Sequence, residues 1–161
     1  GSQGGRLMHN VAGKAVGFKE ALEPGFERYA QQVVDNAKAL GERLEEHGFS
    51  LVSGGTDNHL VLVDLRESHP ETTGKEVEKA LEEVGIVLNA NTVPGETRSA
   101  FNPSGIRAGT PGLTTRGFDE PATREVADLI SRVVDNHDDE SVKAEVADEI
   151  DALTDEYTLY E

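Results

Sequence analysis

Residues 59–65, HLVLVDL, decide the fold. The segment is rich in β-branched and aliphatic residues and is apolar on both faces for part of its length, so we expect a central strand of a sheet. Before it, Gly54-Gly55-Thr56-Asp57 predicts a turn, and residues 49–53 predict a short strand. The segment therefore begins the β-rich part of the chain.

Two helices are predicted before this β-rich part. Apolar residues recur with helical spacing over residues 7–23 and again over residues 26–47, and Pro24-Gly25 separates the two runs. Gly48 is placed to end the second helix. The apolar stripe of that helix consists of Tyr29, Val33, Ala37, Leu40 and Leu44.

Alternating elements follow the central strand. Thr73 is a suitable amino-terminal cap for a helix that runs to about Val84 and closes at Gly85. Residues 86–89 predict a third strand, residues 91–103 a long polar loop, and Ile106 lies on a fourth strand.

Two further helices complete the pattern. One begins at Asp119 or Glu120, with Pro121 in its first turn, and the other covers residues 141–154 after a hydrophilic break. Short strands with helices on one side predict an α+β fold of two layers. We expect a short, mostly antiparallel sheet with helices on one face, preceded by long linking helices.

The composition excludes several classes of protein. The chain has 161 residues, no cysteine and a formal net charge of -16. Disulfides, thiolate metal sites and cysteine nucleophiles are therefore excluded, and the negative charge disfavours binding to nucleic acid or acidic membranes. No apolar run is long enough for a membrane span and no signal peptide is evident, so we expect a cytoplasmic protein.

The acidic excess also suggests an environment. The sequence contains 31 acidic and only 15 basic residues. Such a balance fits an organism with a salty cytoplasm, where ions screen the repulsion between carboxylates. The alternative is an ordinary acidic protein with a solvated face.

Arg107 is the best candidate for binding an anionic small molecule. It lies among small residues in the segment 104–111, SGIRAGTP, and small neighbours allow a ligand to approach the backbone closely. A guanidinium offers two parallel donors that match a carboxylate. The alternative is a structural salt bridge at the end of a strand.

No metal site is expected. The five histidines lack metal-ligand spacing on a helix. We interpret Asp57 and His59 as part of a turn held by hydrogen bonds between side chains and backbone. The acidic run from Asp135 to Glu140 is interpreted as a solvated helix connection because it lacks the pattern of a calcium loop.

Several segments together resemble serine hydroxymethyltransferase, also called glycine hydroxymethyltransferase. The resemblance covers about residues 3–135, and its most specific parts are residues 52–64 and 104–111. The matching segments are residues 3–5 (QGG), 7–9 (LMH), 15–24 (AVGFKEALEP), 32–34 (QVV), 36–38 (NAK), 52–64 (VSGGTDNHLVLVD), 73–76 (TGKE), 104–111 (SGIRAGTP) and 115–118 (TRGF).

The resemblance implies an enzyme of fold type I that depends on pyridoxal phosphate. The family transfers a one-carbon unit between serine and tetrahydrofolate and yields glycine. Its members are much longer, so the resemblance implies a carboxy-terminal portion. Residues 1–25 would be the tail of the large cofactor-binding domain with a linking helix, residues 26–136 the small domain, and residues 137–161 an acidic carboxy-terminal helix.

The resemblance also implies roles for individual residues. Arg107 matches the arginine that binds the substrate α-carboxylate. Gly4 and Gly5 match a loop that approaches the cofactor phosphate of the neighbouring subunit, here followed by Arg6 where bacterial members usually have proline. The loop that contacts the folate pterin is matched by Asn91, Ser99, Ala100 and Phe101.

Two departures from the family pattern qualify these roles. Ala100 stands where the family usually has proline, and some archaea use other pterins, so the carrier is tetrahydrofolate or a related pterin. The Schiff-base lysine motif has no counterpart, and we expect no catalytic residue in this chain. The lysines that lie outside any such motif are Lys14, Lys19, Lys38, Lys75, Lys79 and Lys143.

Three hypotheses for the chain follow. The first is the small domain of the enzyme, inactive alone, which needs the large amino-terminal domain and a homodimer or higher oligomer. The second is a separate module that binds an amino acid or folate at Arg107. The third is a non-catalytic assembly partner that pairs with the full-length enzyme through the two helices of residues 7–47.

Overall fold

The computed structural model describes residues 4–5 and 7–159. Gln3 and Arg6, which belong to the amino-terminal part of the family pattern, lie outside the described residues. Internal contacts divide the chain into two units, Gly1–Gln31 and Gln32–Glu161.

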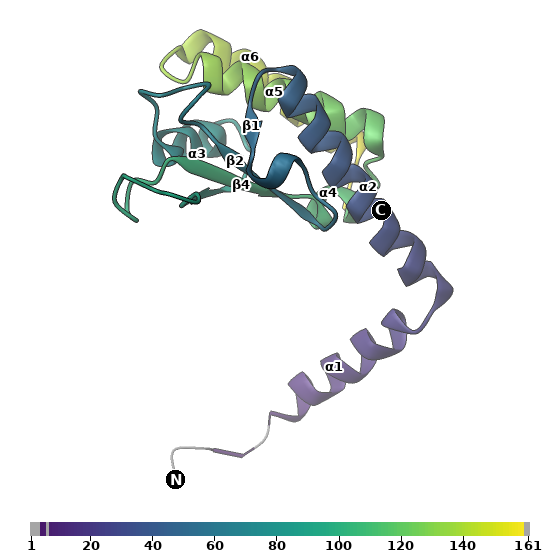
Figure 1. The fold of residues 1–161 in the computed structure, drawn as a ribbon. Helices are drawn as coiled ribbons and strands as arrows, with labels where there is room; N and C mark the ends of the chain where they lie inside the picture. Colours follow the sequence, from purple (N-terminus) through teal and green to yellow (C-terminus); the bar gives the residue numbers. More distant parts are fainter. Residues whose placement is uncertain (1–3, 6, 160–161) are drawn as a thin grey trace. The chain divides into compact units, whose positions relative to one another are not determined.

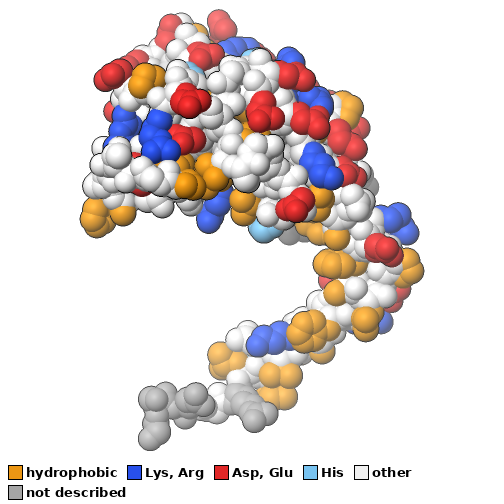
Figure 2. Space-filling model, viewed as in Figure 1, with side chains coloured by type: hydrophobic (Ala, Val, Ile, Leu, Met, Phe, Trp, Pro, Cys, Tyr) orange, Lys and Arg blue, Asp and Glu red, His pale blue; other side chains and the backbone are white. Residues whose placement is uncertain are grey.

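The first unit is helical. Helix α1 covers Met8–Ala21, which confirms the first predicted helix. The unit ends within α2 (Pro24–Glu46), whose residues from Gln32 onward belong to the second unit. None of the described residues of α1 is buried, although the helix carries large apolar side chains. Figure 2 shows these hydrophobic side chains along the helix. The most exposed of them are Met8, Val16 and Phe18, each with more than half of its surface exposed.

The second unit contains an antiparallel sheet of four strands. Their order is β1-β2-β4-β3, and the strands cover Ser50–Leu51 (β1), Leu60–Asp64 (β2), Asn89–Asn91 (β3) and Gly105–Gly109 (β4). The HLVLVDL segment therefore forms a central strand, as the sequence predicts. The predicted α+β class is confirmed as well.

Helices cover one face of this sheet. They are the part of α2 from Gln32 onward, whose Leu40 and Leu44 belong to the same core, together with α3 (Gly74–Glu83), α5 (Glu120–Asp135) and α6 (Glu140–Glu156). The last three lie above the sheet in Figure 1. The sheet residues that face these helices are buried because alternate side chains of a strand point to opposite faces. They are Val61 and Val63 of β2 and Ile106 and Ala108 of β4.

Side-chain caps start the three helices. Thr73 and Glu76 form a capping box at α3, in which Thr73 Oγ1 accepts from the Glu76 N–H and the Glu76 carboxylate accepts from the Thr73 N–H. Asp119 accepts a hydrogen bond from the Ala122 N–H at the start of α5. Asp139 does the same at α6, so all three helix starts agree with local sequence signals to within a residue or two.

A buried amide joins α2 to the β4–α5 connection. Asn36 is fully buried, and its Nδ2 donates to Thr114 Oγ1 and to the Phe118 carbonyl, both at 2.9 Å. Four residues of the stripe predicted for α2 are buried: Val33, Ala37, Leu40 and Leu44. This apolar stripe and the two hydrogen bonds of Asn36 hold α2 on the core from Gln32 onward.

The structure corrects three of the expected elements. Strand β1 has two residues because a 3₁₀ turn begins at Val52, where Ser53 adopts a φ of 64°. Strand β3 covers Asn89–Asn91 instead of residues 86–89, since Ile86 and Leu88 pack into the core before the chain meets β4. A short helix, α4 (Pro111–Thr115), is not among the ranges predicted above.

Candidate functional site

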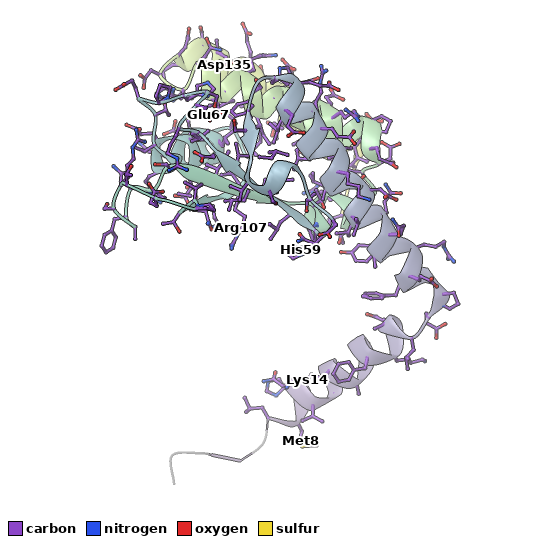
Figure 3. The ribbon with its side chains drawn as sticks, viewed as in Figure 1. Met8, Lys14, His59, Glu67, Arg107 and Asp135 are labelled. Carbon is purple, nitrogen blue, oxygen red and sulfur yellow. The ribbon has the colours of Figure 1, made fainter. Side chains whose placement is uncertain are left out.

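The sheet face opposite the helices carries the candidate site. Along β2 the side chains of Leu60, Leu62 and Asp64 alternate with the buried ones and are only half-buried. On β4, Arg107 occupies the same face and is exposed, and Asn89 lies beside it on β3. Figure 3 shows Arg107 projecting from the sheet, on the side away from α5 and α6.

The strand register fixes the surroundings of Arg107. Its partners across the ladders are Leu62 on β2 and Asn89 on β3. Arg107 Nη2 lies 3.5 Å from Asn89 Oδ1, at the outer limit of a hydrogen bond. Among the described residues, no carboxylate lies within 4 Å of this guanidinium. The charge is therefore left available for a ligand.

The one acidic residue on the open face of β2 already has a partner. Arg66 Nε donates to both oxygens of Asp64, at 3.0 and 3.1 Å, and its Nη2 donates to Oδ2 at 2.6 Å. The hydrogen bonds from Arg66 lower the pKa of Asp64 below its usual value. Asp64 therefore stays ionised at neutral pH and is bound to Arg66, so it does not neutralise Arg107.

The loop between β3 and β4 contains the predicted pterin-binding residues. Asn91 ends β3, and its Nδ2 donates to the Thr92 carbonyl at 2.7 Å. Ser99 and Ala100 are exposed, and a turn follows in which the Asn102 N–H donates to the Ser99 carbonyl. Phe101 is 93% exposed. The structure thus presents an aromatic ring to solvent at the tip of this loop.

Glu96 holds the loop together at its base. Its carboxylate accepts from the Ser104 N–H at 2.8 Å and from Ser104 Oγ at 2.7 Å, and also from the N–H groups of Thr97 and Arg98, both at 2.9 Å. These hydrogen bonds, that of the Ser104 N–H above all, lower the pKa of Glu96 to about 2. The sequence reasoning missed this residue.

The predicted phosphate-binding residues Gly4 and Gly5 belong to the first unit. Both are exposed, and a Cβ added at either would meet nothing within 4 Å. The described structure therefore leaves space for a ligand beside the backbone at both positions.

The Asp57–His59 turn is held by neither of those two side chains. Asn58 Oδ1 accepts from the Leu60 N–H at 3.1 Å, and Thr56 Oγ1 accepts from the Asn58 N–H at 3.2 Å. The side chains of Asp57 and His59 are exposed.

In the part of the chain that the structure describes, no group of three or more His, Asp and Glu side chains is placed to bind a metal. No described helix is long and apolar enough to traverse a lipid bilayer.

Asn89 is a second residue that the sequence reasoning missed. It lies directly opposite Arg107, but this neighbour could be found only from the register of β3 against β4. For Glu96 a sequence signal existed, since it follows the Pro94-Gly95 turn within an otherwise polar loop. That pattern does not reveal that the buried Ser104 donates hydrogen bonds to the Glu96 carboxylate.

A cleft of about 440 Å³ lies elsewhere in the second unit. Apolar residues of α4, of α6 and of the segment before β3 line the cleft, among them Ile86, Leu113 and Ile150. Ala108 also lines the cleft, whereas its neighbour Arg107 does not, as expected for adjacent residues of a strand. The cleft and the Arg107 face are therefore separate features.

Comparisons with known proteins show which family the chain belongs to. The family model of serine hydroxymethyltransferase matches residues 1–130. All 161 residues align with serine hydroxymethyltransferase of Haloarcula marismortui at 80% identity and of Natronomonas pharaonis at 76%, both from halophilic archaea. The chain spans 39% and 38% of the lengths of these two curated relatives. By both the family model and this identity, the chain belongs to the serine hydroxymethyltransferase family.

Proposed function

We propose that the chain is the carboxy-terminal portion of an enzyme that transfers a one-carbon unit between serine and a tetrahydropterin. In this proposal residues 1–25 belong to the large cofactor-binding domain with its linking helix, residues 26–136 form the small domain, and residues 137–161 form an acidic terminal helix. A cytoplasmic location and assembly as a homodimer or higher oligomer are part of the same proposal. The family membership supports it.

Arg107 is the substrate-binding residue of this proposal. The observation that carries it is a guanidinium without a carboxylate partner among the described residues, in a chain with 31 acidic side chains. Two parallel N–H donors would hold the α-carboxylate of serine and fix the orientation of the amino acid. Its small neighbour Gly109, two residues further along β4, is exposed and leaves the strand accessible on that side.

The proposed cofactor is pyridoxal phosphate, which supplies an electron sink for breaking a bond at the amino acid α-carbon. The described residues would form only a small part of the binding site for this cofactor. Gly4 and Gly5 offer exposed amides that suit the phosphate of a neighbouring subunit, and the family's covalent lysine has no counterpart here. The chain alone is therefore proposed to be inactive.

The pterin would lie against the β3–β4 loop. Asn91, Ser99 and Ala100 offer amide, hydroxyl and backbone groups, and Phe101 offers an exposed ring for a flat heterocycle. The carrier in this proposal is tetrahydrofolate or a related pterin.

Completion of the enzyme tests this proposal. The amino-terminal portion of the Haloarcula marismortui relative is joined to this chain, and we call the product the completed enzyme. With pyridoxal phosphate and tetrahydrofolate in molar potassium chloride, it should convert serine to glycine, whereas the chain alone should not. A completed enzyme that folds and binds the cofactor, yet leaves serine unchanged, would contradict the proposal.

A further inference from the structure

We propose that Glu96 is a positioning residue that holds the β3–β4 loop in the shape that presents Phe101 to the pterin. This inference rests on the proposed function, since it concerns the same pterin site. Glu96 itself does not contact the ligand in this account. It acts through the loop.

The first argument is the chemistry of the four hydrogen bonds at Glu96. Each partner is a donor: the N–H groups of Thr97, Arg98 and Ser104, and Ser104 Oγ. A carboxylate accepts all four. A glutamine amide would place an NH₂ group against at least one of these N–H donors, so neutral glutamine cannot reproduce the arrangement. The site therefore requires an anion.

The second argument is what these bonds connect. Ser104 is the last residue of the loop and Glu96 lies eight residues before it, so the carboxylate closes residues 97–103 into a ring. Ser104 is 1% exposed and precedes Gly105, the first residue of β4. The loop is thereby fixed to the buried start of β4, the strand that carries Arg107. Figure 1 shows this loop extending from one end of the sheet.

Two arginines hold the sides of the same loop. Arg98 donates to the carbonyls of Pro70 and Thr72, at 2.6 and 2.7 Å. Arg66 donates to the carbonyls of Pro94 and Gly95, both at 2.9 Å. Charged donors on backbone carbonyls are strong hydrogen bonds. The base of the loop is thus fixed by three charged side chains.

The hydrogen bonds at the base of the loop affect the position of Phe101 at its tip. Phe101 is 93% exposed, and within the described residues no aromatic ring packs on it. A loose loop would allow such a ring to collapse onto nearby apolar surface. A braced loop keeps the ring in one place before the ligand arrives, which reduces the entropy lost on binding.

Steady-state kinetics of the completed enzyme test the inference. We expect Glu96→Gln to raise the KM for tetrahydrofolate about tenfold, while the KM for serine and kcat stay within about twofold. Glu96→Asp, which keeps the anion, should recover part of this loss. Glu82→Gln is the matched control, because Glu82 is exposed on α3 and its side chain has no hydrogen bond in the described structure. It should behave as the wild type.

A double-mutant cycle tests whether Glu96 acts through Phe101. Phe101→Ala should itself raise the KM for tetrahydrofolate, and Glu96→Gln should add little in that background. An unchanged KM for tetrahydrofolate in Glu96→Gln, an equal rise in both KM values, or full additivity with Phe101→Ala would overturn the role of Glu96. An active wild type would leave the proposed function standing in each of these cases, whereas a wild type without turnover would overturn both.

Discussion

Arg107 Nη2 and Asn89 Oδ1 lie 3.5 Å apart across the ladder between β4 and β3. A neutral amide at this distance orients the guanidinium only weakly and leaves its charge uncompensated. Arg107 therefore has no carboxylate partner among the described residues on the open face of the sheet, although the net charge of the chain is -16.

Gly105 is predicted to be indispensable for this face. A Cβ there would lie 2.4 Å from Val93 Cγ1 and 2.6 Å from the Val63 carbonyl oxygen, and backbone cannot yield easily. We expect Gly105→Ala to lower the free energy of unfolding by about 3 kcal/mol or more, measured by urea denaturation at constant potassium chloride.

Gly112→Ala is the control for that substitution. In α4 a Cβ at Gly112 would meet nothing within 4 Å, so the change should be neutral or raise the free energy of unfolding by up to about 1 kcal/mol. Equal destabilisation by both substitutions would contradict the packing around β4.

Stability should fall with acid through the Glu96 carboxylate. Hydrogen bonds lower its pKa from 4.5 to about 2 in the folded chain. The stabilisation is fully present above the unfolded pKa and is lost as the pH falls from about 5 to about 2. Melting temperatures over this range at constant salt should decline less steeply in Glu96→Gln than in the wild type. Parallel declines in the two proteins would show that Glu96 makes no such contribution.

Salt is expected to stabilise the chain. Figure 2 shows acidic side chains spread over the helices of the face in view, and their mutual repulsion is screened by ions. Salt also weakens exposed ion pairs such as Arg132–Glu149, at 2.8 Å, but such pairs contribute about 0–1 kcal/mol each. The melting temperature should therefore rise from dilute buffer to molar potassium chloride. An unchanged or lower value in molar salt would mean that repulsion is not dominant.

The isolated chain should not retain pyridoxal phosphate. None of its lysines lies in the motif of the covalent lysine, and its proposed share of the cofactor site is two glycine amides. After mixing and dialysis we expect no cofactor absorbance, and calorimetry with glycine should show no binding. Glycine binding that disappears in Arg107→Ala would instead support a separate amino-acid-binding module.

The sequence predicts those parts of the fold that depend on local signals. The HLVLVDL segment forms a central strand between β1 and β4, as its β-branched and aliphatic side chains predict. The Thr73 cap places the start of α3 because Glu76 completes a capping box. The sequence predicts the start of strand β3 three residues before its observed start at Asn89. Ile86 and Leu88 look like strand residues, but they pack into the core before the ladder begins.

The site was only partly predictable for a related reason. Arg107 could be identified from its small neighbours and from the family pattern. Asn89 depends on strand register, and Glu96 depends on where the buried Ser104 lies in space. The spacing of apolar residues along the chain predicts helices and strands, but it does not predict contacts between residues far apart in the sequence.

The most direct test is the kcat/KM for serine of the completed enzyme with Arg107→Ala, beside Lys38→Gln as a control for the loss of one positive charge on α2. If Arg107 binds the α-carboxylate through two charged hydrogen bonds, kcat/KM should fall about 100- to 1,000-fold in Arg107→Ala and stay near the wild-type value in Lys38→Gln. Arg107→Lys should recover little because an ammonium lacks the two-pronged geometry. A kcat/KM within about threefold of the wild type in Arg107→Ala would contradict the account.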